Sequence, residues 1–183
     1  FTSENFNASF ADLLRSQHRI NAHPLDQHLH NGGQTGRNLI NSQEQNVKSF
    51  IGAVDVAVRD YISRLQGDDP VSARRRDGYR YSGLWSVRLT KDGYQPNHVH
   101  DRGWISSAYY VALMPTEKPR DPRAGWLKLG EPNRAPAGCG PEKFIEPKLG
   151  MLVLFPSYFW HGTAPFEGSE RLSAAFDVVP SSP

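Results

Sequence analysis

The chain has 183 residues, of which 38% are hydrophobic and 22% are charged, and this is the balance of a soluble globular protein. Its formal net charge of +2 is too small to indicate a dedicated nucleic-acid binder, and no apolar run approaches the roughly 20 residues that cross a bilayer. The single cysteine, Cys139, excludes an intrachain disulfide and a four-cysteine zinc site. The chain begins with Phe1 and has no signal-peptide pattern, so we expect part of a longer, cytoplasmic protein.

Two amphipathic helices are predicted in the N-terminal part. In residues 7–20, apolar side chains recur at helical spacing. Residues 44–65 carry a continuous apolar stripe at three- and four-residue spacing, and Gly67 marks the end of this helix. The length of the stripe predicts that this helix packs on the outside of a sheet. Between the helices, residues 23–35 are polar and rich in turn formers, which predicts an ordered loop.

From residue 79 onward the hydrophobic period changes to two, and turn residues separate the runs. The predicted strands cover residues 81–89, 104–114, 125–129, 151–155 and 171–179. Many short strands with Gly and Pro between them are typical of a sandwich or barrel. Helices first and strands after give an α+β class that is mainly β. We expect one domain over residues 1–183, in which residues 1–78 are a helical support and residues 79–183 form the β core.

Three histidines in the β region form a candidate metal site. His98 and His100 lie at the end of a predicted strand, and residues i and i+2 of a strand point to the same side. His161 follows a later strand. Two ligands close in sequence and a third far away are the facial arrangement of non-haem iron sites, which leave open positions for substrate and dioxygen. Imidazole suits Fe, Zn and Cu alike, so the residue types alone do not name the metal.

A candidate anion clamp follows the third histidine. Arg171 and Ser173 face the same side of the last predicted strand, and the residues that follow them, Leu172 and Ala174, are apolar. A guanidinium beside a metal site needs an anionic partner, and together with a hydroxyl it suits a carboxylate. The structural alternative is a salt bridge from Arg171 to Glu167 or Glu170.

These residues resemble the iron(II)/2-oxoglutarate-dependent dioxygenases. The resemblance rests on three motifs in order: His98-x-His100, then His161, then Arg171-x-Ser173. It covers over half of the chain. Domains of this kind often follow tetratricopeptide repeats, which would account for a chain that does not begin with Met.

The resemblance implies a fold, two cofactors and a reaction. The fold is a double-stranded β-helix, also called a jelly roll, with the N-terminal helices as support. Fe(II) would be held by His98, His100 and His161, and 2-oxoglutarate would be the co-substrate, with Arg171 and Ser173 on its distal carboxylate. The reaction is oxidative decarboxylation of 2-oxoglutarate coupled to hydroxylation of a second substrate.

The second position of the histidine pair departs from the pattern of the superfamily. Most members have an Asp or Glu where His100 stands, and Asp101 is the next residue here. Strand parity places Asp101 on the opposite face, so three histidines are the expected ligands and Asp101 is the alternative. A neutral histidine in place of a carboxylate leaves the metal site one unit more positive.

The resemblance also makes Arg88 a candidate co-substrate contact, because the strand before the histidine pair often supplies one in this superfamily. A surface arginine on an edge strand is the alternative for Arg88. The expected partners are 2-oxoglutarate, dioxygen and a second substrate, which is a peptide or protein or else a small molecule. We expect no nucleic-acid and no membrane partner.

A cupin-like metal-binding module or isomerase without 2-oxoglutarate is the alternative function. A glycine before the histidine pair and Pro156 before the third histidine fit it. The cupin pattern has Glu a few residues after the pair and Gly two residues after the proline, where this chain has Trp104 and Tyr158. These mismatches and the presence of Arg171 favour the oxygenase. A third possibility is an oxygenase fold that has lost turnover and serves as a binding module.

Overall fold

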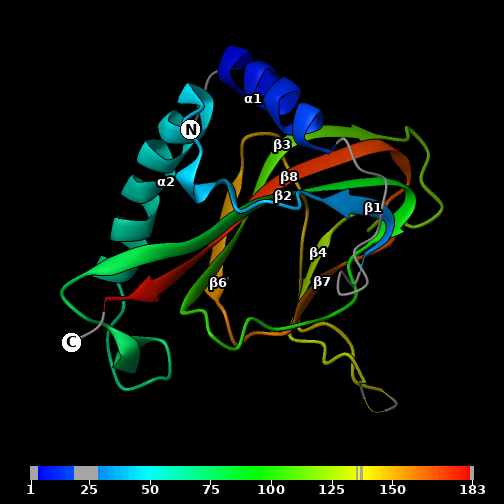
Figure 1. Ribbon diagram of the computed structural model, residues 1–183. Coiled ribbons are helices and arrows are strands. Elements are labelled where there is room, and N and C mark those ends of the chain that lie inside the picture. The colour runs from blue at the N-terminus through cyan, green and yellow to red at the C-terminus, as the bar shows by residue number, and fades with distance from the viewer. Residues whose placement is uncertain (1–3, 19–28, 135, 137, 182–183) are drawn as a thin grey trace.

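Two α-helices and two antiparallel sheets make up the part of the chain that the computed structural model describes, which is residues 4–18, 29–134, 136 and 138–181 (Figure 1). The helices are α1 (Glu4–Gln17) and α2 (Gln45–Ser63), with the short 3-10 helices η1 (Leu39–Asn41) and η2 (Ser72–Arg74). None of these described helices has the length and apolarity needed to span a membrane.

The larger sheet has five strands in the order β1-β2-β8-β3-β6. Their bounds are β1 (His30–Gln34), β2 (Tyr79–Tyr94), β3 (Ile105–Pro115), β6 (Leu152–Pro156) and β8 (Gly168–Pro180). The smaller sheet has the order β5-β4-β7, with β4 (Leu127–Leu129), β5 (Lys143–Ile145) and β7 (His161–Thr163). Every pairing between these strands is antiparallel. The expected α+β class, mainly β, is confirmed.

Helix α2 covers the outer face of the larger sheet, on the side away from β4 and β7 (Figure 1). Its buried side chains, at the predicted spacing of three and four residues, are Val47, Phe50, Val54 and Val58. The ring of Phe50 lies 5.0 Å from that of Tyr109 on β3 and 6.3 Å from that of Phe176 on β8, measured between centroids. The prediction that this helix packs on the outside of a sheet is therefore confirmed.

Strand β8 lies between the apolar core under α2 and a cavity on the other side of the larger sheet. Because side chains alternate along a strand, its two faces have different compositions. The face under α2 is apolar and buried, and it carries Leu172, Ala174, Phe176 and Val178. The opposite face borders a cavity between the two sheets, and it carries Arg171, Ser173, Ala175 and Asp177.

Three of these strands are not predicted from the sequence. The sequence predicts a loop over residues 23–35, but residues 30–34 form β1, which pairs with β2. A Cβ at Gly32 would lie 2.5 Å from the Arg88 carbonyl oxygen, so glycine is what lets this segment approach β2. Strands β5 and β7 have three residues each, too few to show alternation, and both are set by pairing with β4. Residues 19–28, which include part of the predicted loop and the end of the first predicted helix, lie outside the described residues.

Candidate metal centre

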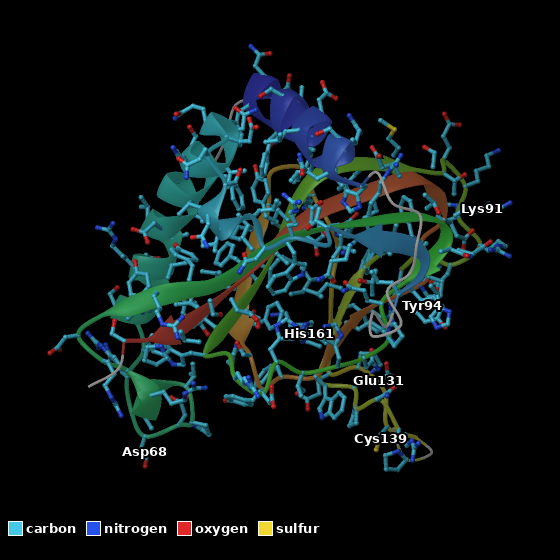
Figure 2. The ribbon with its side chains drawn as sticks, viewed as in Figure 1. Asp68, Lys91, Tyr94, Glu131, Cys139 and His161 are labelled. Atoms are coloured by element: carbon cyan, nitrogen blue, oxygen red, sulfur yellow. The ribbon has the colours of Figure 1, made fainter. Side chains whose placement is uncertain are left out.

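A cavity of about 600 Å³ lies between the two sheets, within the usual range of small-molecule sites. Both sheets contribute to its apolar wall, for example Val87 on β2, Leu127 on β4 and Phe155 on β6. The polar groups that line it include the three predicted histidines and the inward face of β8. Figure 2 labels His161, which lies in this interior between the two sheets.

The backbone holds two of the histidines side by side. His161 is the first residue of β7, and His98 lies in the connection between β2 and β3. Their backbone amides donate to each other's carbonyl oxygens at 2.9 Å in both directions, which forms an isolated antiparallel bridge. Residues paired in this way point to the same side, and the two ring centroids are 4.2 Å apart. Strand β2 ends at Tyr94, so His98 and His100 lie beyond the strand and not at its end as predicted, and the bridge to His161 orients His98 instead.

His100 completes the group. Its ring centroid lies 5.2 Å from that of His98 and 5.0 Å from that of His161. Each histidine offers one ring nitrogen, and these three nitrogens lie within 4.8 Å of one another. The structure thus brings together the three histidines singled out in the sequence, as a cluster able to hold one metal ion.

A hydrogen bond at Nδ1 fixes the orientation of each ring. His98 Nδ1 lies 2.9 Å from the Pro96 carbonyl oxygen, and His161 Nδ1 lies 2.9 Å from the Phe159 carbonyl oxygen. His100 Nδ1 lies 2.7 Å from a carboxylate oxygen of Asp177. Carbonyl and carboxylate oxygens only accept, so each Nδ1 carries a proton and donates it. The metal would therefore be bound by the Nε2 atoms, and ligating histidines commonly have this arrangement.

His161 is held in the neutral form that metals bind. It is 8% exposed. Burial, followed by the nearby His98, lowers the pKa of His161 to about 3. A neutral imidazole at physiological pH needs no deprotonation before it ligates a metal.

Gly162 lets the segments that carry His98 and His161 approach each other. A Cβ at this position would clash with Asn97 Oδ1 and would lie 2.8 Å from the Gln95 carbonyl oxygen. The second of these atoms belongs to the backbone and cannot turn away. The His-Gly dipeptide at the start of β7 is therefore a packing requirement of the site.

Arg171 is 2% exposed and faces the cavity. Its Nε donates to the Gly125 carbonyl oxygen at 3.1 Å, and its guanidinium carbon lies 5.0 Å from the ring centroid of Tyr110. Within the described residues no carboxylate pairs with it: Glu167 pairs with Arg120, and Glu170 with Arg15. The salt-bridge alternative is thus wrong. Burial lowers the pKa of the Arg171 guanidinium, because a buried cation without a counter-ion is costly.

Two hydroxyls accompany Arg171. Ser173 Oγ lies 3.4 Å from the Val87 carbonyl oxygen, a long contact that a stronger acceptor would displace. Tyr110 was not singled out in the sequence. Its buried hydroxyl makes no hydrogen bond of ordinary geometry within the described residues. Burial raises the pKa of Tyr110, and the charge of Arg171 opposes that rise. A carboxylate placed here would give Arg171 and Tyr110 a partner that the described residues do not provide.

Arg88 does not join this group, which contradicts its prediction as a co-substrate contact. Its neighbour Val87 lines the cavity, so strand alternation turns Arg88 to the outer face of β2. There its Nε donates to Glu170 at 2.8 Å, and Glu170 also accepts from Arg15 of α1 at 2.6 Å. Arg88 therefore helps to fasten α1 to the sheet.

Asp101 lies at the edge of the cavity in an exposed turn. In the described chain, the group of side chains able to hold a metal does not include it. Asp177, which is not predicted as a site residue from the sequence, is the carboxylate that does reach the histidines. Its signal was the parity of β8, because Arg171, Ser173 and Asp177 are separated by even numbers of residues.

Residues 83–177, just over half of the chain, match the model of a family described as "Putative 2OG-Fe(II) oxygenase", in which 2OG is 2-oxoglutarate. The chain belongs to this family. The resemblance stated from the sequence is confirmed, and with it Fe(II) as the metal and 2-oxoglutarate as the co-substrate. The three imidazoles fit Fe(II), and Arg171, which no described carboxylate pairs, fits 2-oxoglutarate; the family match favours an oxygenase over a cupin-like protein.

Solved structures share the fold at low sequence identity. A prolyl-4-hydroxylase from Pseudomonas putida has a TM-score of 0.65 at 18% identity, with 100% of this chain and 90% of that chain covered. HygX from Streptomyces hygroscopicus, solved with nickel and 2-oxoglutarate, has a TM-score of 0.66 at 12% identity, with 98% and 80% covered. A viral collagen prolyl hydroxylase from Paramecium bursaria Chlorella virus-1 has a TM-score of 0.59 at 13% identity, with 97% and 91% covered. The double-stranded β-helix is thereby confirmed. Among proteins of curated function, none matches this sequence.

Proposed function

We propose that this protein is an Fe(II)/2-oxoglutarate-dependent dioxygenase that hydroxylates a second substrate. His98, His100 and His161 hold the iron, and Arg171 with Ser173 binds the distal carboxylate of 2-oxoglutarate. One observation carries the proposal. Three ring nitrogens within 4.8 Å of one another share a cavity with a buried guanidinium that no described carboxylate neutralises.

The arrangement suits a dicarboxylate that is bound at both ends. A metal cation attracts the 2-oxo acid end, and a planar guanidinium suits the distal carboxylate, for which it offers two parallel donors. With iron bound, the reaction consumes 2-oxoglutarate and dioxygen, releases succinate and carbon dioxide, and places one oxygen atom in a C–H bond of the substrate.

The residues of the chain orient and enclose the reactants. The Nδ1–H bonds of the three histidines keep the Nε2 atoms directed at one point. Arg171 fixes the position of the co-substrate relative to that point, which converts a bimolecular step into one within a complex. The wall formed by Val87, Leu127 and Phe155 keeps water away from the reacting groups.

A peptide or protein is the second substrate that we favour. Two of the proteins that share this fold are named as prolyl hydroxylases. Tyr158 and Phe159 lie three and two residues before His161, which lines the cavity, and they are 44% and 37% exposed. Exposed aromatic side chains next to an active centre suit an extended peptide chain. HygX has been solved with hygromycin B bound, so a small molecule is the other outcome of the substrate assay.

The test is succinate formation from 2-oxoglutarate by the Fe(II)-loaded protein in air, followed by NMR. We expect wild-type protein to form succinate, and a substrate found among proline-containing peptides to accelerate it and to gain one oxygen atom by mass spectrometry. His161→Ala should form none because it loses an iron ligand.

Arg88→Met is the matched control, since it removes an arginine from the same sheet outside the cavity. It should keep wild-type succinate formation. Wild-type protein that carries a full complement of iron, yet forms no more succinate than iron alone, would contradict the proposal and leave a binding module as the function.

A further inference from the structure

One histidine of the cluster differs from the other two in what holds it. His98 and His161 donate to neutral backbone carbonyl groups, whereas His100 donates to the carboxylate of Asp177. Both Asp177 oxygens lie within reach of His100 Nδ1, at 2.7 and 2.9 Å. Hydrogen bonds to ionised acceptors are about twice as strong as neutral ones, so His100 is the ring most firmly oriented.

Buried hydroxyls in turn hold Asp177. Ser106 Oγ lies 2.7 Å from Asp177 Oδ1 and 2.8 Å from Ser157 Oγ. A serine hydroxyl has a single proton, so Ser106 donates to the carboxylate and accepts from Ser157. Both serines are at most 1% exposed. Ser106 on β3 therefore holds the Asp177 carboxylate directly, and Ser157, just after β6, holds Ser106.

The position of Asp177 behind His100 bears on the missing carboxylate ligand of the histidine pair. His100 stands where most of the superfamily has a carboxylate ligand, which leaves a three-histidine set neutral. Asp177 places a carboxylate behind this position, hydrogen-bonded to the His100 ring and not bound to the metal itself. A carboxylate behind a ligating histidine raises the electron-donating power of the ring.

We propose that Asp177 is the positioning carboxylate of the metal centre. Its hydrogen bond to His100 Nδ1–H directs His100 Nε2 at the iron. Its carboxylate also supplies a negative charge near the metal, which the three histidine ligands do not supply. The proposal rests on the proposed function, because it takes His100 as an iron ligand. It assigns Asp177 no contact with iron or substrate.

The test compares Asp177→Asn, Asp177→Ala and the control Asp101→Asn, which removes an equal charge from the edge of the same cavity. Fe(II) affinity would be measured anaerobically by competition with a chromophoric chelator, without 2-oxoglutarate. Loss of a carboxylate behind a metal-binding histidine typically costs about 10–100-fold in metal affinity, and we expect this for Asp177→Ala. Asp177→Asn keeps an acceptor oxygen, so its loss should be smaller, whereas Asp101→Asn should match wild type.

The Fe(III)/Fe(II) reduction potential separates the charge of Asp177 from a structural role. A negative charge near iron favours Fe(III), so Asp177→Asn should raise the potential while its far-UV circular dichroism and melting temperature stay close to wild type. A role limited to joining β3 and β8 would leave the potential unchanged.

The outcomes separate this role from the proposed function. Wild-type affinity and potential in Asp177→Asn would overturn the role of Asp177 alone. A loss in Asp101→Asn and none in Asp177→Asn would make Asp101 the carboxylate of the centre. Wild-type protein that binds no Fe(II) at micromolar concentration would overturn the proposed function together with this role.

Discussion

At the scale of single residues, the candidate centre depends on which side chain occupies the second position of the histidine pair. His100 contributes a ring nitrogen to the cluster, while Asp101 is exposed at the edge of the cavity and lies outside the cluster. His100→Ala should therefore lose Fe(II) affinity by more than the roughly 10–100-fold cost of a change behind a ligand. Asp101→Ala should keep it. Elemental analysis after desalting measures both, and the reverse pattern would show that the chain rotates to present Asp101.

Arg171 and Ser173 should contribute to 2-oxoglutarate binding and not to iron binding. Arg171→Met should keep iron but lose about 2–5 kcal/mol of 2-oxoglutarate binding, the usual cost of removing one side of a buried charge pair, or about 30-fold to several thousand-fold in Kd. Ser173→Ala should lose only about 1 kcal/mol, as for one ordinary hydrogen bond.

Anaerobic titration of 2-oxoglutarate into the iron-loaded protein, followed by metal-to-ligand absorption, measures both affinities. Arg88→Met again serves as the control, because its guanidinium binds Glu170 on the outer face. Equal affinities in the Arg171→Met and wild-type proteins would remove Arg171 from the clamp.

At the scale of elements, helix α2 supports the centre from the far side of the sheet. Phe50 packs against Phe176 on β8, and the next residue along that strand, Asp177, points into the cavity. Phe50→Ala should lower the free energy of unfolding by about 3–5 kcal/mol, because it deletes a fully buried ring.

Val56→Ala on the same helix is the control, since Val56 is 66% exposed. It should change the stability by no more than about 0.5 kcal/mol. Urea unfolding of the three metal-free proteins provides the comparison. A loss under about 1 kcal/mol in Phe50→Ala would mean that α2 contributes little to the core.

At the scale of the whole molecule, two histidines from distant parts of the chain should make the metal-free protein sensitive to acid. Burial, and then the charge of Arg88, lowers the pKa of His18 to about 4, and burial lowers that of His161 to about 3. In an unfolded chain a histidine has a pKa of about 6.5. The unfolded state therefore binds more protons below that pH, and the free energy of unfolding should fall as the pH falls from about 6.5 toward 4.

His18→Gln tests this prediction because it removes one of the two groups. Its free energy of unfolding should depend less steeply on pH than that of wild type, when both are measured in urea at pH 7, 6 and 5. His18 Nε2 lies 3.0 Å from Ser86 Oγ, and glutamine can form a similar hydrogen bond. Identical pH dependence in the two proteins would show that His18 protonates alike in the folded and unfolded states.

The helix that supports the sheet, the mainly β class, and the motifs that place the chain among the 2-oxoglutarate oxygenases could all be predicted from the sequence. These depend on local spacing. A stripe at three and four residues gives α2 one buried face, and alternation gives β8 one apolar and one polar face. Local spacing also identified His98, His100 and Arg171 as residues that face one interior.

Which distant segments pair with one another could not be predicted from the sequence and follows from the packed fold. The His98–His161 bridge, the short strands β5 and β7, and the strand formed by residues 30–34 exist through pairing with segments far along the chain. Parity alone could not say that Arg88 faces outward, nor that Asp177 stands behind His100. The physical reason is that alternation fixes two sides of a strand, and only the packed neighbours decide which side becomes the interior.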